Sequence, residues 1–297
     1  MFLGKSNSST PTLGRITQIK VSERLKAREK ICGLITGAGA VANAWNPVIR
    51  ALQPHYDFPL TSDSANSILA RIIYLVRWFS CLKTEHGATQ YRIHLELLNE
   101  FKTSISRELK EAQGSGEITV RASLIACTKL FMLSHSKKFV YITTNWDSVG
   151  SHAIKKELNK THHTNIYPLH IHGHFDAPSG IYLPTEMVKE PYRSTEEEMT
   201  LGSAHGMAWR ALEPATRIIL FGLSLSPLDA ELQQIIACGL DFDCKKEVII
   251  VDPNHSEIAQ RVNLLIRPAR NISVTGYSPD NLAKKYTYTV KRQNNKV

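Results

Sequence analysis

The residues of this sequence that could do chemistry lie directly after short apolar runs. Asn145 and Asp147 follow the run 139–144, and His172 follows the run 166–171. The Asn145 carboxamide can orient a hydroxyl group or a water molecule, and the imidazole of His172 can accept a proton near neutral pH. Asp147 suits an orienting role or the cap of a following helix, and Asn145 also suits an ordinary turn. These three residues are the candidates for catalysis.

Three other strand ends carry small or polar residues typical of nucleotide-binding turns. The candidate binding residues are Gly37, Ala38, Gly39, Gly222, Ser224 and Asp252. Glycines let backbone amides and a helix N-terminus approach a phosphate group, and a carboxylate at a strand end can accept hydrogen bonds from a ribose. The same residues occur in ordinary turns, and Asp252-Pro253-Asn254 is as typical of a turn as of a ribose contact. No one of these six residues indicates a nucleotide-binding site by itself, but the six together do.

The apolar runs themselves predict a parallel sheet. They span 30–36, 139–144, 166–171, 217–222, 247–251 and 272–275, and helical patterns at 229–237 and 256–265 lie between the later ones. Short apolar runs that alternate with helices are typical of an α/β fold with a doubly wound, mostly parallel, Rossmann-like sheet. Ligands of such sheets bind outside the carboxyl ends of the strands, which is where the polar residues lie.

A helical insertion separates the first two predicted strands. Helical patterns begin near Asp63, cover 91–112 and extend over 118–136, so the insertion spans about 60–136 within a domain of residues 29–283. Trp78 and Trp209 stand in apolar helical surroundings and are predicted to be core residues.

The net charge of +9 is concentrated at the two ends of the chain. Residues 1–30 carry +5 and residues 281–297 carry +5, which leaves −1 for residues 31–280. We therefore expect a basic N-terminal arm (1–28) and a basic C-terminal tail (284–297). Such tails can bind nucleic acid or an acidic partner, or can simply be solvated, so the charge alone does not indicate DNA binding.

The cysteines and the hydropathy pattern narrow the class of protein. The five cysteines form no C-x-x-C pair, which favours reduced thiols and argues against a cysteine-ligated zinc site. The most hydrophobic stretch, 68–82, contains Arg71 and Arg77, and the N-terminus has no apolar signal segment. A cytoplasmic protein without a membrane span is expected.

Taken in order, five motifs resemble those of the sirtuin superfamily. They are GAG (37–39), TTNWD (143–147), HIHG (170–173), FGLSLSPLD (221–229) and VIIVDPN (248–254). Sirtuins have a GAG phosphate turn, a T-x-N-x-D strand end, a His-Gly pair, a Gly-x-Ser turn and a final strand with a polar ribose contact. An ordinary Rossmann dehydrogenase fits less well, because the region where its acidic ribose ligand would lie is predicted to be helical.

The departures from the deacetylating sirtuins indicate one branch. Their two C-x-x-C zinc pairs are missing, Val41 stands at the position of a serine, and Ala44-Trp45-Asn46-Pro47 replaces their Gly-Ile-Pro-Asp-Phe-Arg stretch. What remains resembles the short bacterial sirtuin-like NADases of antiphage defence, which lack the zinc module and carry a helical insertion. The resemblance implies that NAD is the substrate, that nicotinamide and ADP-ribose are released, and that no structural zinc is needed. The amphipathic faces of the helical insertion exceed what one sheet needs to cover, so we expect a homo-oligomer formed through the insertion. At least one basic tail is expected to dock on a separate partner, and the resemblance implies a HerA-type ATPase for that role.

Two alternatives from other classes stay open. His170, His172 and His174 alternate, so on a strand they would share one face, as in a metal-dependent hydrolase or nuclease. Gly173 argues against this, because it predicts that the strand ends before His174. The other alternative is a non-catalytic nucleotide-binding subunit, which would keep the glycine turns and bind NAD without turnover.

Overall fold

The computed structural model describes residues 30–162, 167–241, 246–266 and 271–289. Its centre is a seven-stranded sheet in the order β5-β4-β1-β6-β7-β8-β9. The strands are β1 (Ile31–Thr36), β4 (Lys138–Thr143), β5 (Leu169–His170), β6 (Arg217–Phe221), β7 (Lys246–Val251), β8 (Ile272–Ser278) and β9 (Asn281–Tyr288). All neighbouring pairs are parallel except β8 and β9, which are antiparallel. The predicted Rossmann-like α/β fold is confirmed.

The strand order reverses between β1 and β6. From β1 the chain continues to β4 and β5 on one side, and then returns to add β6, β7 and β8 on the other side. In doubly wound sheets the loops diverge at such a switch point and leave a crevice at the carboxyl ends of the strands. The central strands are apolar and buried on both faces, as parallel strands covered by helices must be.

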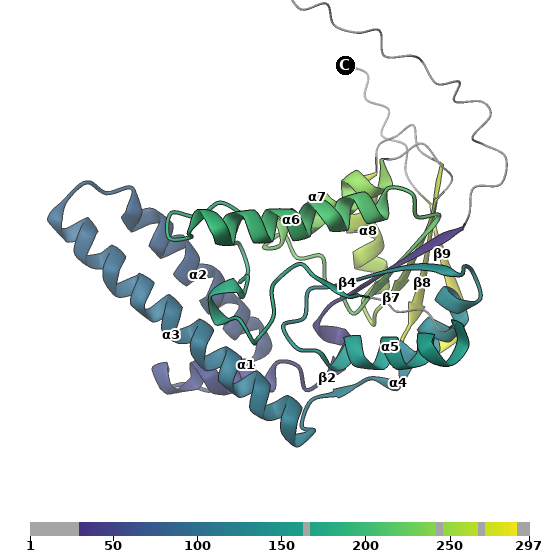
Figure 1. The fold of residues 1–297 in the computed structure, drawn as a ribbon, viewed down its shortest axis with the longest axis horizontal. Helices are drawn as coiled ribbons and strands as arrows, with labels where there is room; N and C mark the ends of the chain where they lie inside the picture. Colours follow the sequence, from purple (N-terminus) through teal and green to yellow (C-terminus); the bar gives the residue numbers. More distant parts are fainter. Residues whose placement is uncertain (1–29, 163–166, 242–245, 267–270, 290–297) are drawn as a thin grey trace, which may run out of the picture.

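Helices cover both faces of this sheet (Figure 1). One face packs against α6 (Thr195–Leu212), α7 (Ala230–Leu240) and α8 (His255–Leu265), through side chains such as Leu212, Ile236 and Val262. The other face packs against α4 (Ala122–Cys127) and α5 (Val149–His162), with Leu124 and Leu158 in a separate core. The two cores together exclude water from the sheet.

The helical insertion follows β1. It contains α2 (Ser62–Ser80) and α3 (Glu85–Ser115), which pack against each other and against α1 (Asn46–Leu52) around a third core. In Figure 1 the α2–α3 hairpin extends away from the sheet. Thr61 begins α2 with a capping box, and Gly116, at φ 76°, ends α3 in the left-handed conformation.

Several predicted elements differ from the structure. Residues 118–136 are not one helix, because β3 (Thr119–Val120) pairs with β2 (Val41–Ala42), and α4 then leads into a π-helical segment, Thr128–Leu133. The third run forms a strand only at Leu169–His170, and its residue 166 lies outside the described residues. The predicted run 272–275 lies within β8, but β9 is not predicted from the sequence, and residues 284–288 belong to this strand rather than to a tail.

The prediction that Trp78 and Trp209 are core residues is wrong. Trp78 is 52% exposed on α2 and Trp209 is 43% exposed on α6. Each tryptophan lies on the solvent-exposed face of its helix. The apolar residues next to it in the sequence lie on the opposite face and pack into the core. The arm 1–28 and residues 290–297 lie outside the described residues. Within the described part, no helix is both long and apolar enough to cross a membrane.

Candidate functional site

A cleft of about 400 Å³ opens at the carboxyl ends of β1, β4, β6 and β7. It lies at the switch point, where the fold places ligands of doubly wound sheets. All nine predicted site residues line it: Gly37, Ala38, Gly39, Asn145, Asp147, His172, Gly222, Ser224 and Asp252. Residues up to 215 positions apart in the sequence therefore meet in one cavity.

The glycine turns bring the ends of β1 and β6 together. Gly39 donates its amide to the carbonyl of Gly222 at 3.1 Å, and Gly37 donates its amide to the carbonyl of Phe221 at 3.0 Å. These two amides are therefore already used within the protein, contrary to the expectation that they bind a phosphate. The expected helix N-terminus is also absent here, since Ala38–Ala40 is a single 3₁₀ turn and α1 begins only at Asn46.

The loop after β6 has free backbone amides that could bind a phosphate, whereas the amides of Gly37 and Gly39 are already used within the protein. Gly222 has φ 60° and Leu225 has φ 48°, which turns the backbone back on itself. Within the described residues, the amides of Ser224 and Leu225 have no acceptor in the protein. The carbonyl of Ser224 accepts a hydrogen bond from Arg261 of α8. Backbone amides beside a guanidinium suit an anion such as a phosphate.

The end of β4 presents Asn145 and Asp147. Asn145 is only 8% exposed, and its amide donates to Oγ1 of Thr143 at 3.1 Å. Within the described residues the Asn145 carboxamide has no side-chain partner, although it lines the cleft. Asp147 accepts a hydrogen bond from the Val149 amide at 2.9 Å, which caps α5, and burial raises the pKa of this carboxyl group. Asp147 thus has the helix-capping role that the sequence allowed.

The imidazole of His172 has one aromatic neighbour, Tyr182, and one acidic neighbour, Asp229. Its ring stacks on Tyr182, with ring centroids 5.1 Å apart and an interplanar angle of 16°. Its Nε2 lies 3.4 Å from Oδ1 of Asp229, which also accepts a hydrogen bond from the Leu232 amide and so caps α7. The helical pattern 229–237 places Asp229 at a helix N-terminus, but it does not indicate the contact with His172. Because Nε2 faces Asp229, Nδ1 is the nitrogen left for a ligand.

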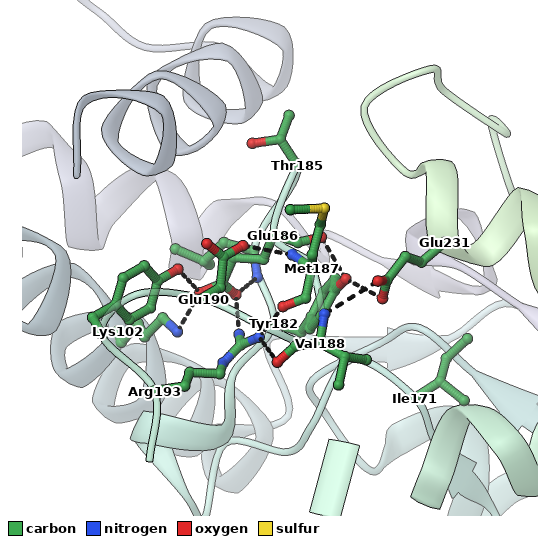
Figure 2. A network of polar contacts seen from close by, with 12 residues as sticks. Lys102, Ile171, Tyr182, Thr185, Glu186, Met187, Val188, Glu190, Arg193 and Glu231 are labelled. Carbon is green, nitrogen blue, oxygen red and sulfur yellow. Dashed lines mark hydrogen bonds and ion pairs between the residues drawn. The ribbon is translucent and has the colours of Figure 1, made fainter. Parts of the chain in front are cut away.

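A buried polar network holds the segment that carries Tyr182 (Figure 2). Glu186 accepts from Lys102 of α3 at 2.8 Å and pairs with Arg193 at 2.8 Å, while the Tyr182 hydroxyl donates to Glu231 of α7 at 2.5 Å. Burial lowers the pKa of Lys102 despite its acidic partner. The network ties the helical insertion and α7 to the backbone beneath His172, so the imidazole rests on a fixed support.

The three alternating histidines do not form one cluster: the rings of His170 and His174 lie edge to face with centroids 5.0 Å apart, whereas His172 stacks on Tyr182. The strand β5 ends at His170, before His174 as Gly173 predicted, and each imidazole has a different polar partner. His170 contacts Ser151 and the Asn145 carbonyl, His172 contacts Asp229, and His174 contacts Ser148. Burial lowers the pKa of His170 to about 4. Among the described residues, no group of three or more His, Cys, Asp or Glu side chains could hold a metal ion.

Asp252 lies at the β7 end of the cleft. Its Oδ1 accepts a hydrogen bond from the Asn254 amide at 2.8 Å, which closes the turn that the sequence allowed, and burial raises the pKa of the carboxyl group. Asp252 also lines the cleft, so the turn and a ligand contact are compatible.

Sequence reasoning missed several lining residues. Trp45 lies directly before α1, Asp63 and Asn66 lie near the start of α2, and Glu257 and Arg261 come from α8. Helical periodicity marks which face of a helix is apolar, but not which polar residue meets a distant strand end. Comparison of the sequence with protein-family models and with curated proteins finds no match.

Proposed function

We propose that the cleft binds NAD and that the protein hydrolyses the bond between nicotinamide and ribose, releasing nicotinamide and ADP-ribose. The observation that carries the proposal is the meeting of all nine predicted residues in one cleft at the switch point. The resemblance to sirtuin-like NADases supplies the substrate, and the cleft supplies residue types that suit its cleavage.

The layout of the cleft fits an elongated dinucleotide. Asn145 and His172 lie beyond β4, and Asp252 follows β7, with β1 and β6 between these strands. At roughly 4.8 Å per strand, the two ends of the site are on the order of 14 Å apart. The nicotinamide ribose belongs at the Asn145 end, the adenosine ribose at the Asp252 end, and the pyrophosphate near the loop 222–226 and Arg261.

The charges of the cleft favour a cationic transition state. Two of the carboxyl groups that line it lie near the proposed reaction centre, Asp147 two residues after Asn145 and Asp229 at 3.4 Å from His172. As the glycosidic bond breaks, its electron pair moves to the pyridinium nitrogen, nicotinamide leaves as a neutral molecule, and positive charge develops on the ribose ring. Fixed carboxylates in a partly buried cleft stabilise that charge more strongly than water would.

Asn145 and His172 divide the remaining tasks. The Asn145 carboxamide positions the attacking water or a ribose hydroxyl without bringing a charge of its own. Water attacks C1′ of the ribose, and Nδ1 of His172 takes up the proton that the water loses. Oδ1 of Asp229 lies 3.4 Å from the opposite nitrogen, Nε2, so a proton on Nε2 faces a carboxylate while Nδ1 serves as the acceptor.

The proposed biological role of the protein rests on the resemblance to the sirtuin-like NADases. We propose an antiphage effector that depletes NAD, acts as a homo-oligomer and pairs with a HerA-type ATPase. The stacked pair Tyr74 and Trp78, which is 59% and 52% exposed on α2, supports an oligomer interface on the helical insertion.

Light scattering of the full chain tests this oligomer. A monomer at high protein concentration would contradict the proposal, as would a Trp78→Ala variant that assembles like the wild type.

The activity itself is tested with the purified full chain and NAD. Chromatography should detect nicotinamide and ADP-ribose in equal amounts, without an acetylated peptide and with or without EDTA. Complete inhibition by EDTA would favour the metal-dependent hydrolase. The third outcome is tight binding of ADP-ribose with no nicotinamide release from NAD, either by the chain alone or after addition of the partner ATPase. That outcome would favour the non-catalytic nucleotide-binding subunit.

A further inference from the structure

Glu231 lies in the first turn of α7, and three hydrogen-bond donors surround its carboxylate (Figure 2). Oε2 accepts from the Tyr182 hydroxyl at 2.5 Å and lies 3.2 Å from Nδ1 of His205, while Oε1 accepts from the Val188 amide at 3.1 Å. Burial by itself would raise the pKa of Glu231, but these hydrogen bonds lower it to about 2. Glu231 is therefore a carboxylate at neutral pH.

The first connection from Glu231 to His172 runs through Tyr182, which is only 3% exposed. The phenol ring stacks on the imidazole of His172, and its hydroxyl, at the tip of the ring, meets the carboxylate. The Glu186 carbonyl is a second acceptor for this hydroxyl, but the charged oxygen of Glu231 is the stronger one. The guanidinium of Arg193 also lies 5.1 Å from the ring centroid. The ring is thus tethered, and it presents a fixed face to the imidazole.

The second connection runs through His205 of α6. Its Nδ1 faces Glu231, and its Nε2 lies 2.8 Å from the carbonyl oxygen of Ile171, the residue directly before His172. Both neighbours are acceptors, so the imidazole of His205 donates to both when each of its nitrogens carries a proton. Ile171 is fully buried, and its amide donates to the carbonyl of Thr143 at 3.1 Å. The backbone that carries His172 is therefore held between β4 and the helices α6 and α7.

We infer that Glu231 is a positioning residue that fixes the imidazole of His172 from two sides. Tyr182 transmits the contact to the ring, and His205 transmits it to the backbone. Both connections start from one carboxylate, so its loss would loosen the stacked ring and the backbone together. The expected effect on turnover rests on the proposed function, in which Nδ1 of His172 takes up the proton of the attacking water. The fixing of the ring does not rest on it.

Loss of Glu231 should lower kcat and leave the affinity for the dinucleotide unchanged, because its side chain does not line the cleft in the described part of the chain. A general base must lie within hydrogen-bond reach of the proton that it accepts, and a misplacement of about 1 Å can lower a rate up to about a hundredfold. The contact between His172 and Asp229 remains in such a variant. We therefore expect a smaller loss in kcat, about tenfold.

Three variants remove the support to different degrees. Glu231→Ala removes both connections, and alanine suits a helix. Glu231→Gln keeps an uncharged oxygen that can accept from Tyr182 and His205, so it should restore part of the lost kcat. Tyr182→Phe keeps the stacked ring and removes only its hydroxyl. Glu96→Ala, at an exposed position on α3 outside the cleft, is the control. Steady-state nicotinamide release from NAD gives kcat and KM, and calorimetry with ADP-ribose gives the affinity.

The imidazole protons of His172 report the stacking directly. Protons above the face of an aromatic ring are shifted upfield by its ring current, so the NMR signals of His172 should move downfield when the tether is lost. His172→Ala identifies these signals among those of the 12 histidines. A lower stability alone would not move them selectively in the folded protein.

The expected result is a lower kcat with unchanged KM in Glu231→Ala and Tyr182→Phe, together with downfield shifts of the His172 signals. Glu231→Gln should lose less kcat than Glu231→Ala, and Glu96→Ala should match the wild type. If Glu231→Ala does not fold, Tyr182→Phe decides by the same criteria.

The outcomes separate the inference from the proposed function. A wild-type kcat in both Glu231→Ala and Tyr182→Phe, or unmoved His172 signals in both, would overturn the inference and leave the hydrolysis intact. A raised KM with a wild-type kcat would also overturn it, because the residue would then act in binding. If the wild type cleaves no NAD, the proposed hydrolysis fails, while downfield shifts in the variants would still support the positioning role. Unmoved signals in that case would overturn both.

Discussion

Gly39 and Gly222 meet backbone to backbone where the strand order reverses. A Cβ atom at Gly39 would lie 2.7 Å from Cα of Gly222, and a Cβ atom at Gly222 would lie 2.5 Å from the carbonyl carbon of Gly39. Real Cβ atoms do not come so close to backbone atoms, and Gly222 also has φ 60°. The two glycines are needed for this contact, which forms the floor of the cleft between β1 and β6.

Gly39→Ala and Gly222→Ala should each lower the free energy of unfolding by about 2 kcal/mol or more, because the two turns must separate or strain. Urea denaturation measures the change. Gly114→Ala is the control: Gly114 lies near the end of α3, and an alanine Cβ there would have no heavy atom within 4 Å, so alanine should be neutral or stabilising by up to about 1 kcal/mol. Equal stability of Gly39→Ala and the wild type would contradict the close contact.

Asp229→Asn should lower kcat about tenfold or more with little change in KM. Asparagine caps a helix as well as aspartate does, so the thermal midpoint should stay close to the wild-type value. Its amide can donate a hydrogen bond to Nε2 of His172, which favours the tautomer with the proton on Nδ1 and removes the proposed base. Asp229→Ala should lose both kcat and stability, since it removes the cap as well. A wild-type kcat in Asp229→Asn would show that the contact with His172 has no part in turnover.

The protein should lose stability as the pH falls from about 6.5 to about 4 because of His170. Burial holds the pKa of His170 at about 4 in the folded state, against an ordinary value of 6.5. Between these values the unfolded chain binds a proton that the folded protein does not, which favours unfolding by at most about 3 kcal/mol. Denaturant titrations at pH 7 and pH 4.5 measure this loss. In His170→Asn the stability difference from the wild type should shrink on acidification, and a constant difference would contradict the assignment.

The cysteines should differ in reactivity according to their burial. Cys81 is exposed, whereas Cys32 and Cys127 are buried, and burial raises the pKa of the Cys32 thiol to about 12. Only a thiolate reacts quickly with a disulfide reagent, so in native protein Cys81 should react well before these two. Mass spectrometry after brief labelling identifies the sites, with Cys81→Ser as control. Early labelling of Cys32 would indicate that the sheet opens readily.

The sequence predicted the sheet and the floor of the site because both depend on local signals. The buried strands β1, β6 and β7 are continuous apolar runs, and polar residues follow each of them directly. What it missed depends on tertiary contacts. The pair Asp229 and His172, the network around Glu186 and the approach of Arg261 to Ser224 join segments that are tens of residues apart, and no spacing along the chain encodes them. The strand β9 has an alternating, mostly exposed pattern, which is a weak signal for an edge strand.

The most direct test of the central claim is nicotinamide release from NAD by Asn145→Ala and His172→Ala. Each variant should be at least about a hundredfold slower than the wild type, because an orienting or proton-transfer group is lost, while circular dichroism and the thermal midpoint stay close to wild type. Asn99→Ala on α3 and His152→Ala on α5, both exposed positions outside the cleft, should release nicotinamide at the wild-type rate. Wild-type nicotinamide release by both Asn145→Ala and His172→Ala would contradict the assignment of this cleft as an NAD-cleaving site.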